Sequence, residues 1–135
     1  MKTQSAKAKG RRLQQLVASV LLNKFPSLSE DDIRSTSMGA QGEDIQLSSK
    51  ARELIPFSIE CKNQERVNIW DAITQSNSNS KGNTPIVVIK KNNTQPHVVI
   101  SLNAFVSLIG TDKNNTPSNN QQVIEYLQKI ISDLQ

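Results

Sequence analysis

Two acids and a lysine in the first half of the chain have the types and spacing to do chemistry together. Glu60 and Lys62 lie two positions apart in residues 57–62, where apolar and polar side chains alternate. Because residues two apart share a face of a β-strand, both charges are expected on the same side. Asp44 reaches that place if the short strand that contains it lies alongside. Two carboxylates and an ammonium group suit a hard divalent cation and a phosphate.

An exposed ion pair is the alternative explanation for the same three residues. A cross-strand Glu–Lys pair on a protein surface contributes less than about 1 kcal/mol to stability and implies no activity. Residue types alone do not distinguish a metal and phosphate site from an exposed ion pair, so the choice depends on the surrounding elements.

Length and composition predict an ordinary intracellular domain. The chain has 135 residues and a single cysteine, so no internal disulfide forms and a reducing compartment is expected. It contains no Cys/His cluster for zinc, no secretory signal and no apolar run of membrane length. We expect neither a membrane partner nor a small-molecule cofactor.

The charge distribution favours a polyanionic partner. Six basic residues precede the first acid, Glu30, and the net charge is +4. Nucleic acid is the first expectation and an anionic membrane the second, whereas a solvated basic terminus is the alternative. Candidate contacts to DNA phosphates are Lys7, Lys9, Arg11, Arg12, Arg34, Lys90 and Lys91.

The first half of the chain predicts a helix followed by three strands. A disordered basic tail at residues 1–7 precedes a helix from about residue 8, which Pro26 ends. Its apolar stripe is Leu13, Leu16, Val17, Val20 and Leu21, with Arg11, Arg12, Gln14 and Gln15 largely off it. Strands are expected at residues 33–38, 43–47 and 57–62, with a polar connection at 48–56.

The second half predicts a helix, two strands and further helices. Asn68 is expected to cap a helix over residues 69–77 that buries Ile69, Trp70, Ala72 and Ile73. Residues 76–84 have the composition of a loop, and Pro85 opens the β-branched run 86–89, typical of a central strand. A return strand at 98–102, a helix through Ile109, a linker at 110–120 and an amphipathic helix at 121–135 follow. This order predicts an α/β sandwich around a mixed sheet.

The motifs in this order resemble the PD-(D/E)XK nuclease superfamily. That superfamily has the restriction-endonuclease-like fold and includes archaeal-type Holliday-junction resolvases and small phage endonucleases. The matching residues are Gly42-Glu43-Asp44 and Glu60-Cys61-Lys62, within a resemblance that covers residues 8–109. It implies a three-layer sandwich with a mixed central sheet flanked by helices, to which this chain adds a C-terminal helix.

The resemblance also implies roles for individual residues. Asp44 and Glu60 would bind Mg²⁺, for which Mn²⁺ would substitute, and the Cys61 backbone carbonyl would be a further ligand. Lys62 would orient or deprotonate the attacking water, or neutralise the transition state. Losing one such electrostatic contact typically lowers a rate by about 10²–10³.

The chain departs from the resolvase pattern on its first helix. Resolvase-like members often carry a metal-binding Glu there, whereas this chain has Gln14 and Gln15. A second metal ion is therefore the weakest part of the hypothesis. Gln14, Gln64 and Gln75 are candidate accessory residues, with ordinary surface polarity as the alternative.

Other reactive residues are interpreted as structural. The Cys61 side chain shares the apolar face of its strand and is expected in the core. His97 has no acid or cysteine nearby in sequence, and Glu43 is expected to point away from Asp44.

The resulting hypothesis is a Mg²⁺-dependent DNA endonuclease of phage or mobile-element origin, acting on duplex or branched DNA. A Holliday-junction resolvase is the alternative within this class, and a non-catalytic nucleic-acid-binding module with the same fold is the alternative outside it. The C-terminal helix either packs on its own domain or forms a homodimer, which a nuclease that cuts both strands would need.

Overall fold

The structure is a computed structural model that describes residues 4–36, 42–110 and 120–134. The chain divides into two compact units, with the division after Ser101. Each unit is described by itself, since their relative position is not determined.

Helices and strands follow one another in a mixed order along the first unit. In order they are α1 (Gln4–Lys24), β1 (Ile33–Ser35), β2 (Ile45–Leu47), α2 (Ser49–Leu54), β3 (Phe57–Asn63), α3 (Ile69–Asn79), β4 (Thr84–Lys90) and β5 (His97–Ile100).

 The described part of this unit thus comprises three helices and five strands.

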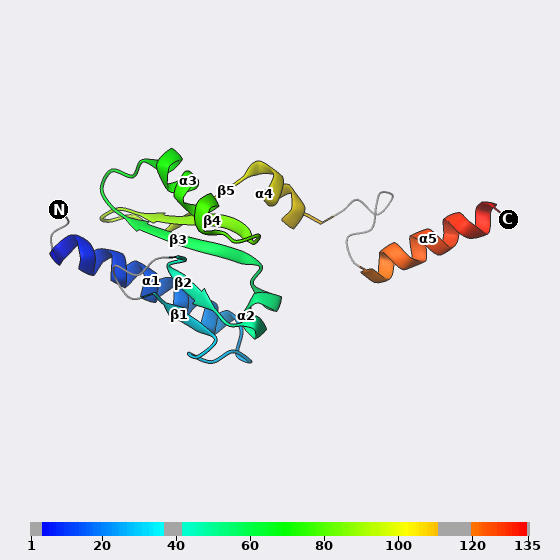
Figure 1. The fold of residues 1–135 in the computed structure, drawn as a ribbon, viewed down its shortest axis with the longest axis horizontal. Helices are drawn as coiled ribbons and strands as arrows, with labels where there is room; N and C mark the ends of the chain where they lie inside the picture. The colour runs from blue at the N-terminus through cyan, green and yellow to red at the C-terminus, as the bar shows by residue number, and fades with distance from the viewer. Residues whose placement is uncertain (1–3, 37–41, 111–119, 135) are drawn as a thin grey trace. The chain divides into compact units, whose positions relative to one another are not determined.

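The strands form two small sheets. β1 and β2 pair antiparallel, with Ile33 opposite Leu47. In the larger sheet, of order β3-β4-β5, β3 and β4 are parallel and β4 and β5 are antiparallel. The predicted mixed sheet is therefore confirmed, with the β-branched strand β4 at its centre as expected. α3 covers one side of this sheet and α1 lies on the other, beside β1 and β2 (Figure 1).

The core lies between α1 and the two sheets. Leu13 of α1, Ile33 of β1, Ile45 of β2 and Ile59 of β3 are each at most 3% exposed. Their burial joins the small sheet to β3 through α1, because apolar side chains from all four elements leave water together. Cys61 belongs to the same cluster, which confirms its predicted place in the core.

α1 differs from its prediction in where it begins and in which face it buries. The helix begins at Gln4, so residues 4–7 are helical and not a disordered tail. Gln14 is buried, whereas Leu16 and Val20 of the predicted stripe are 44% and 57% exposed. The buried face is rotated because α1 packs against β1 as well as β3, and one apolar stripe in the sequence does not reveal two partners.

α2 replaces the polar connection expected at residues 48–56, so that prediction is wrong. Ser48 caps the helix, because its Oγ accepts the Ala51 N–H at 3.1 Å. The same Oγ donates to Asp32 Oδ1 at 2.7 Å, and Ala51 is buried. A helix of six residues is too short to show a helical period in the sequence.

α3 confirms its predicted cap but extends further and buries a different face. The Asn68 side chain accepts the Asp71 N–H at 3.1 Å, and the helix continues to Asn79. Ala72 is buried as predicted, but Trp70 is 78% exposed, so its predicted burial is wrong. A residue two positions from Ala72 points about 200° around the helix from it, and therefore away from the sheet.

The second unit contains α4 (Leu102–Leu108) and α5 (Asn120–Leu134), close to the two helices expected there. α4 has no buried residue, and the described side chains of α5 are exposed. The expected linker lies outside the described residues except for its two ends. Over the part of the chain that the structure describes, no helix combines the length and apolarity needed to cross a membrane.

Candidate active site

Asp44 closes the free edge of β3. Its N–H donates to the Ile59 carbonyl at 3.2 Å, and its Oδ2 accepts the Cys61 N–H at 2.7 Å. On its other edge β3 pairs with β4 along its whole length, with Glu60 opposite Val87. The expected adjacency of Asp44 and β3 is therefore present, although Asp44 precedes β2 by one residue and does not lie within it.

The turn before Asp44 needs its glycine. Gly42 has a φ of +99°, in the left-handed region that side chains other than glycine rarely adopt. A β-carbon there would meet no other atom, so the constraint comes from the backbone angle and not from space. After this turn, Asp44 lies at the edge of β3 and forms hydrogen bonds with Ile59 and Cys61.

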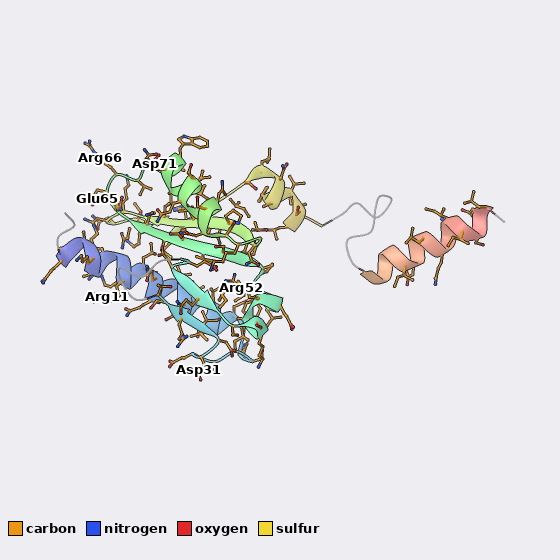
Figure 2. The ribbon with its side chains drawn as sticks, in the orientation of Figure 1. Arg11, Asp31, Arg52, Glu65, Arg66 and Asp71 are labelled. Carbon is orange, nitrogen blue, oxygen red and sulfur yellow. The ribbon has the colours of Figure 1, made fainter. Side chains whose placement is uncertain are left out.

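Glu43 is held away from the Asp44 carboxylate by α2. Arg52 donates from Nη2 to Glu43 Oε1 at 2.6 Å and from Nη1 to the Phe57 carbonyl at 2.9 Å. Thr36 Oγ1 donates to the Glu43 carbonyl. Arg52 lies on the short helix beside the start of β3 (Figure 2). Neighbouring acids thus have different partners, with Glu43 in an ion pair and Asp44 on the strand edge.

Glu60 is a buried carboxyl group under α3. Its side chain is 1% exposed, and its Oε1 accepts a hydrogen bond from Asn79 Nδ2 at 2.8 Å. The same Nδ2 lies 3.5 Å from the Gly42 carbonyl, so Asn79 connects both motifs. Asn79 was missed because residues 76–84 have the composition of a loop, whereas the last turn of α3 runs through them.

Burial raises the pKa of Glu60 from its ordinary 4.5 to about 7. The Asp44 carboxylate adds to this rise through its charge and a hydrogen bond, while the Asn79 hydrogen bond and the Lys62 charge oppose it. The charges of Asp44 and Lys62 thus act on the Glu60 carboxyl group in opposite directions. The structure places the Asp44 carboxylate on the N–H of Cys61, the residue between Glu60 and Lys62 in β3.

Cys61 contributes its backbone to this site. Burial raises the pKa of its thiol, so the side chain is a poor nucleophile. Its N–H faces Asp44, and because the N–H and C=O of a strand residue point to the same edge, its carbonyl lies on that edge too.

The donor set fits Mg²⁺. Within the described residues, no group of three or more His, Cys, Asp or Glu side chains could hold a metal. Two carboxylates with one carbonyl remain, and Mg²⁺ usually needs only one or two carboxylates beside water and substrate phosphate.

The three candidate accessory glutamines lie in different surroundings. Gln14 is 7% exposed, and its Oε1 has no hydrogen-bond partner among the described residues, which corrects its expected place off the buried face. The Gln64 N–H donates to the Lys90 carbonyl at 3.0 Å, beyond the end of β3. Gln75 is exposed on α3, where Asn79 makes the contact with Glu60.

His97 is exposed, and its Nδ1 lies 2.9 Å from the Gln95 carbonyl.

Three of the seven predicted phosphate-binding residues line one cavity of about 250 Å³: Lys9, Arg12 and Lys90. Lys7, Arg11 and Arg34 are exposed elsewhere, with Arg11 on α1 in Figure 2, whereas Lys91 lines a second cavity together with Lys90. Of these two cavities, the one lined by Lys9, Arg12 and Lys90 holds more of the predicted cations.

The chain matches no protein-family model, no curated protein and no solved structure. No relative therefore assigns a role to Asp44, Glu60 or Lys62. In general, neighbouring acids can hold a divalent cation, and an ammonium group can stabilise a developing anion beside it.

Proposed function

We propose that this protein is a Mg²⁺-dependent DNA endonuclease with an active site formed by Asp44, Glu60 and Lys62. The observation that carries the proposal is the position of the Asp44 carboxylate: its Oδ2 accepts the N–H of Cys61, the residue between Glu60 and Lys62, at 2.7 Å. The helices on both sides of the β3-β4-β5 sheet are compatible with the restriction-endonuclease-like sandwich, which is part of the same proposal.

The residues have separate roles in phosphodiester hydrolysis. Asp44, fixed by the Cys61 N–H, and Glu60, fixed by Asn79, would hold the cation together with the Cys61 carbonyl. Bound Mg²⁺ would polarise a phosphoryl oxygen and lower the pKa of a coordinated water. Lys62 would orient the attacking water or neutralise charge on the phosphoryl oxygens. Glu60 would have to lose its proton before it could bind the cation.

DNA is the proposed substrate because the chain carries cations suited to its backbone. Six basic residues precede Glu30, and three cations gather in one cavity. Contacts of this kind give affinity without reading sequence, so duplex and branched DNA are both candidate substrates.

A cleavage assay with a matched acid control tests the proposal. Wild type is expected to cut at least one of supercoiled plasmid, linear duplex, four-way junction and single strand in Mg²⁺ or Mn²⁺, and EDTA to abolish cutting. Asp44→Asn should lower the rate at least 10²-fold, whereas Asp31→Asn should not, because Asp31 is an exposed acid away from the site.

Two other results would redirect the assignment. A wild-type protein that binds DNA but cuts no substrate with either metal would be a non-catalytic binding module. Cutting confined to the four-way junction would identify a Holliday-junction resolvase.

We also propose that the nuclease acts as a homodimer through α5. Ile124, Leu127, Ile131 and Leu134 recur at three- and four-residue spacing, with Ile and Leu alternating as in two-stranded coiled coils. Sedimentation of the full chain should give a dimer mass that Ile131→Asp shifts to the monomer and Ser132→Asp does not. A monomer at all micromolar concentrations would contradict this proposal.

A further inference from the structure

The cation-lined cavity is formed by three segments that are distant in the sequence. α1 contributes Lys9 and Arg12 together with Leu13 and Leu16, the end of β3 contributes Asn63, and the end of β4 and the following turn contribute Lys90 and Asn92. Lys90 is the register partner of Asn63, so the parallel pairing of β3 and β4 brings these two side chains together.

A hydrogen bond holds α1 to this end of the sheet. Asn63 Nδ2 donates to the Lys9 carbonyl at 2.9 Å, across 54 positions of sequence. Leu13, which is 1% exposed, anchors the same stretch of α1 in the core. Lys9 and Arg12 therefore project from a backbone that is fixed against β3, which reduces the conformational entropy lost when a ligand binds.

The cavity has an excess of positive charge. Its lining has three cationic side chains and no acid among the described residues. Glu65 accepts the Asn92 N–H at 3.3 Å, but its side chain is exposed and lines a different cavity. Asn63 adds a polar group whose buried Oδ1 has no hydrogen-bond partner in the part of the chain described.

We infer that this cavity binds a backbone phosphate of nucleic acid. Lys and Arg side chains supply charge, and the amide group of Asn92 supplies a neutral donor of the kind that contacts phosphate oxygens. The lining contains no aromatic ring on which a base could stack. The subsite is therefore expected to hold DNA without reading its sequence, and its choice of ligand rests on the proposed function.

A membrane is the other polyanion that this helix could meet. Leu16 and Val20 are exposed on α1, and an apolar face beside cations can insert into a lipid interface. The cations here, however, converge on a concave site between three segments, whereas a helix that lies on a membrane presents them along one convex face. This arrangement favours a single phosphate over a lipid surface.

DNA binding in EDTA tests the subsite without requiring cleavage. Fluorescence anisotropy of a labelled duplex should show that Lys9→Gln, Arg12→Gln and Lys90→Gln each weaken binding about five- to tenfold at low salt and lower the salt slope by about 1. Lys24→Gln is the matched control, because it removes the same charge from the other end of α1, and it should change affinity less than about twofold.

Asn92→Asp provides a second variant that leaves the three cations in place. Asn92 is exposed, so the substitution leaves the core intact while placing a negative charge in the lining. We expect it to weaken duplex binding about tenfold or more, with an unchanged circular dichroism spectrum. Binding equal to that of wild type for this variant and the cavity cation variants would overturn the inference.

Vesicles and the nuclease variants separate the remaining outcomes. If phosphatidylserine vesicles bind through the cavity residues while DNA binding is independent of them, the ligand is a lipid surface and the inference is wrong. If wild type cuts no substrate in Mg²⁺ or Mn²⁺ but the cavity variants still lose DNA affinity, the subsite stands and the proposed nuclease function fails. If wild type cuts DNA but the cavity variants bind it as tightly as wild type, the subsite is wrong and the proposed nuclease function stands.

Discussion

β3 connects two charged regions that follow opposite physical rules. At its middle, Glu60 is 1% exposed and has a fixed partner in Asn79, and the next residue, Cys61, binds the Asp44 carboxylate. At its end, the cavity cations are half-buried or exposed and converge around Asn63. A buried carboxyl group is costly unless its partners are in place, whereas lysine and arginine keep their charged ends in water at little cost. The first region can position a reaction, and the second can attract a polyanion.

The largest expected effect is on the cleavage rate, and it comes from a substitution in the carboxylate region that leaves DNA affinity nearly unchanged. Lys62→Ala should lower the single-turnover cleavage rate about 10²–10³-fold, because it removes a cation beside Glu60. DNA affinity in EDTA should change less than about threefold. A variant that loses affinity but keeps its rate would show that Lys62 belongs with the cavity cations and not with the acids.

The pH dependence of stability tests whether Glu60 is as constrained as the structure indicates. Its pKa is raised to about 7, so between pH 4.5 and 7 the folded state keeps a proton that the unfolded state has lost. Its stabilising contribution is complete below pH 4.5 and is lost as the pH rises through 7. Urea denaturation in EDTA should show this decline in wild type.

Glu60→Gln is the matched variant for that profile. It keeps the shape and the hydrogen-bonding capacity of the protonated acid but cannot titrate. The decline in its free energy of unfolding between pH 4.5 and 7 should be smaller than in wild type. Equal slopes in the two proteins would mean that Glu60 ionises normally.

Glu43 is the third acid of the carboxylate region, and removal of its partner Arg52 tests how much this ion pair stabilises the fold. Arg52→Ala should lower the free energy of unfolding by about 2 kcal/mol, because it leaves a carboxylate that is only 12% exposed without its partner. Arg66→Ala removes an exposed arginine, labelled in Figure 2, and should stay within about 0.5 kcal/mol of wild type. Equal losses would indicate that the Arg52–Glu43 pair contributes nothing beyond surface charge.

The smallest expected effect belongs to the cavity. In steady-state cleavage at low salt, Arg12→Gln should raise KM about fivefold and leave kcat within about twofold, since the residue lies apart from the acids in the lining of the cavity. Raising the salt concentration should reduce the difference from wild type, because a lost phosphate contact matters less when salt competes. A fall in kcat of tenfold or more would remove the distinction between the two regions.

Local patterns in the sequence were enough for several elements of the fold. The alternation at residues 57–62 predicted β3, Asn68 predicted the cap of α3, and the run after Pro85 predicted the central strand. Such features depend on neighbours within a few positions, where periodicity and capping act. The same patterns failed for Gln14 and Trp70, whose burial depends on which surfaces α1 and α3 meet.

The sequence by itself determined which charges the molecule carries and which local elements present them, including Glu60 and Lys62 on one face of β3. Only the tertiary structure decided the partners: Asp44 on the edge of β3, Asn79 on Glu60, and Asn63 holding Lys9 near Lys90. These contacts join residues 17, 19 and 54 positions apart. Hydrogen bonds at such separations form only when packing brings their elements together, and no local pattern specifies that packing.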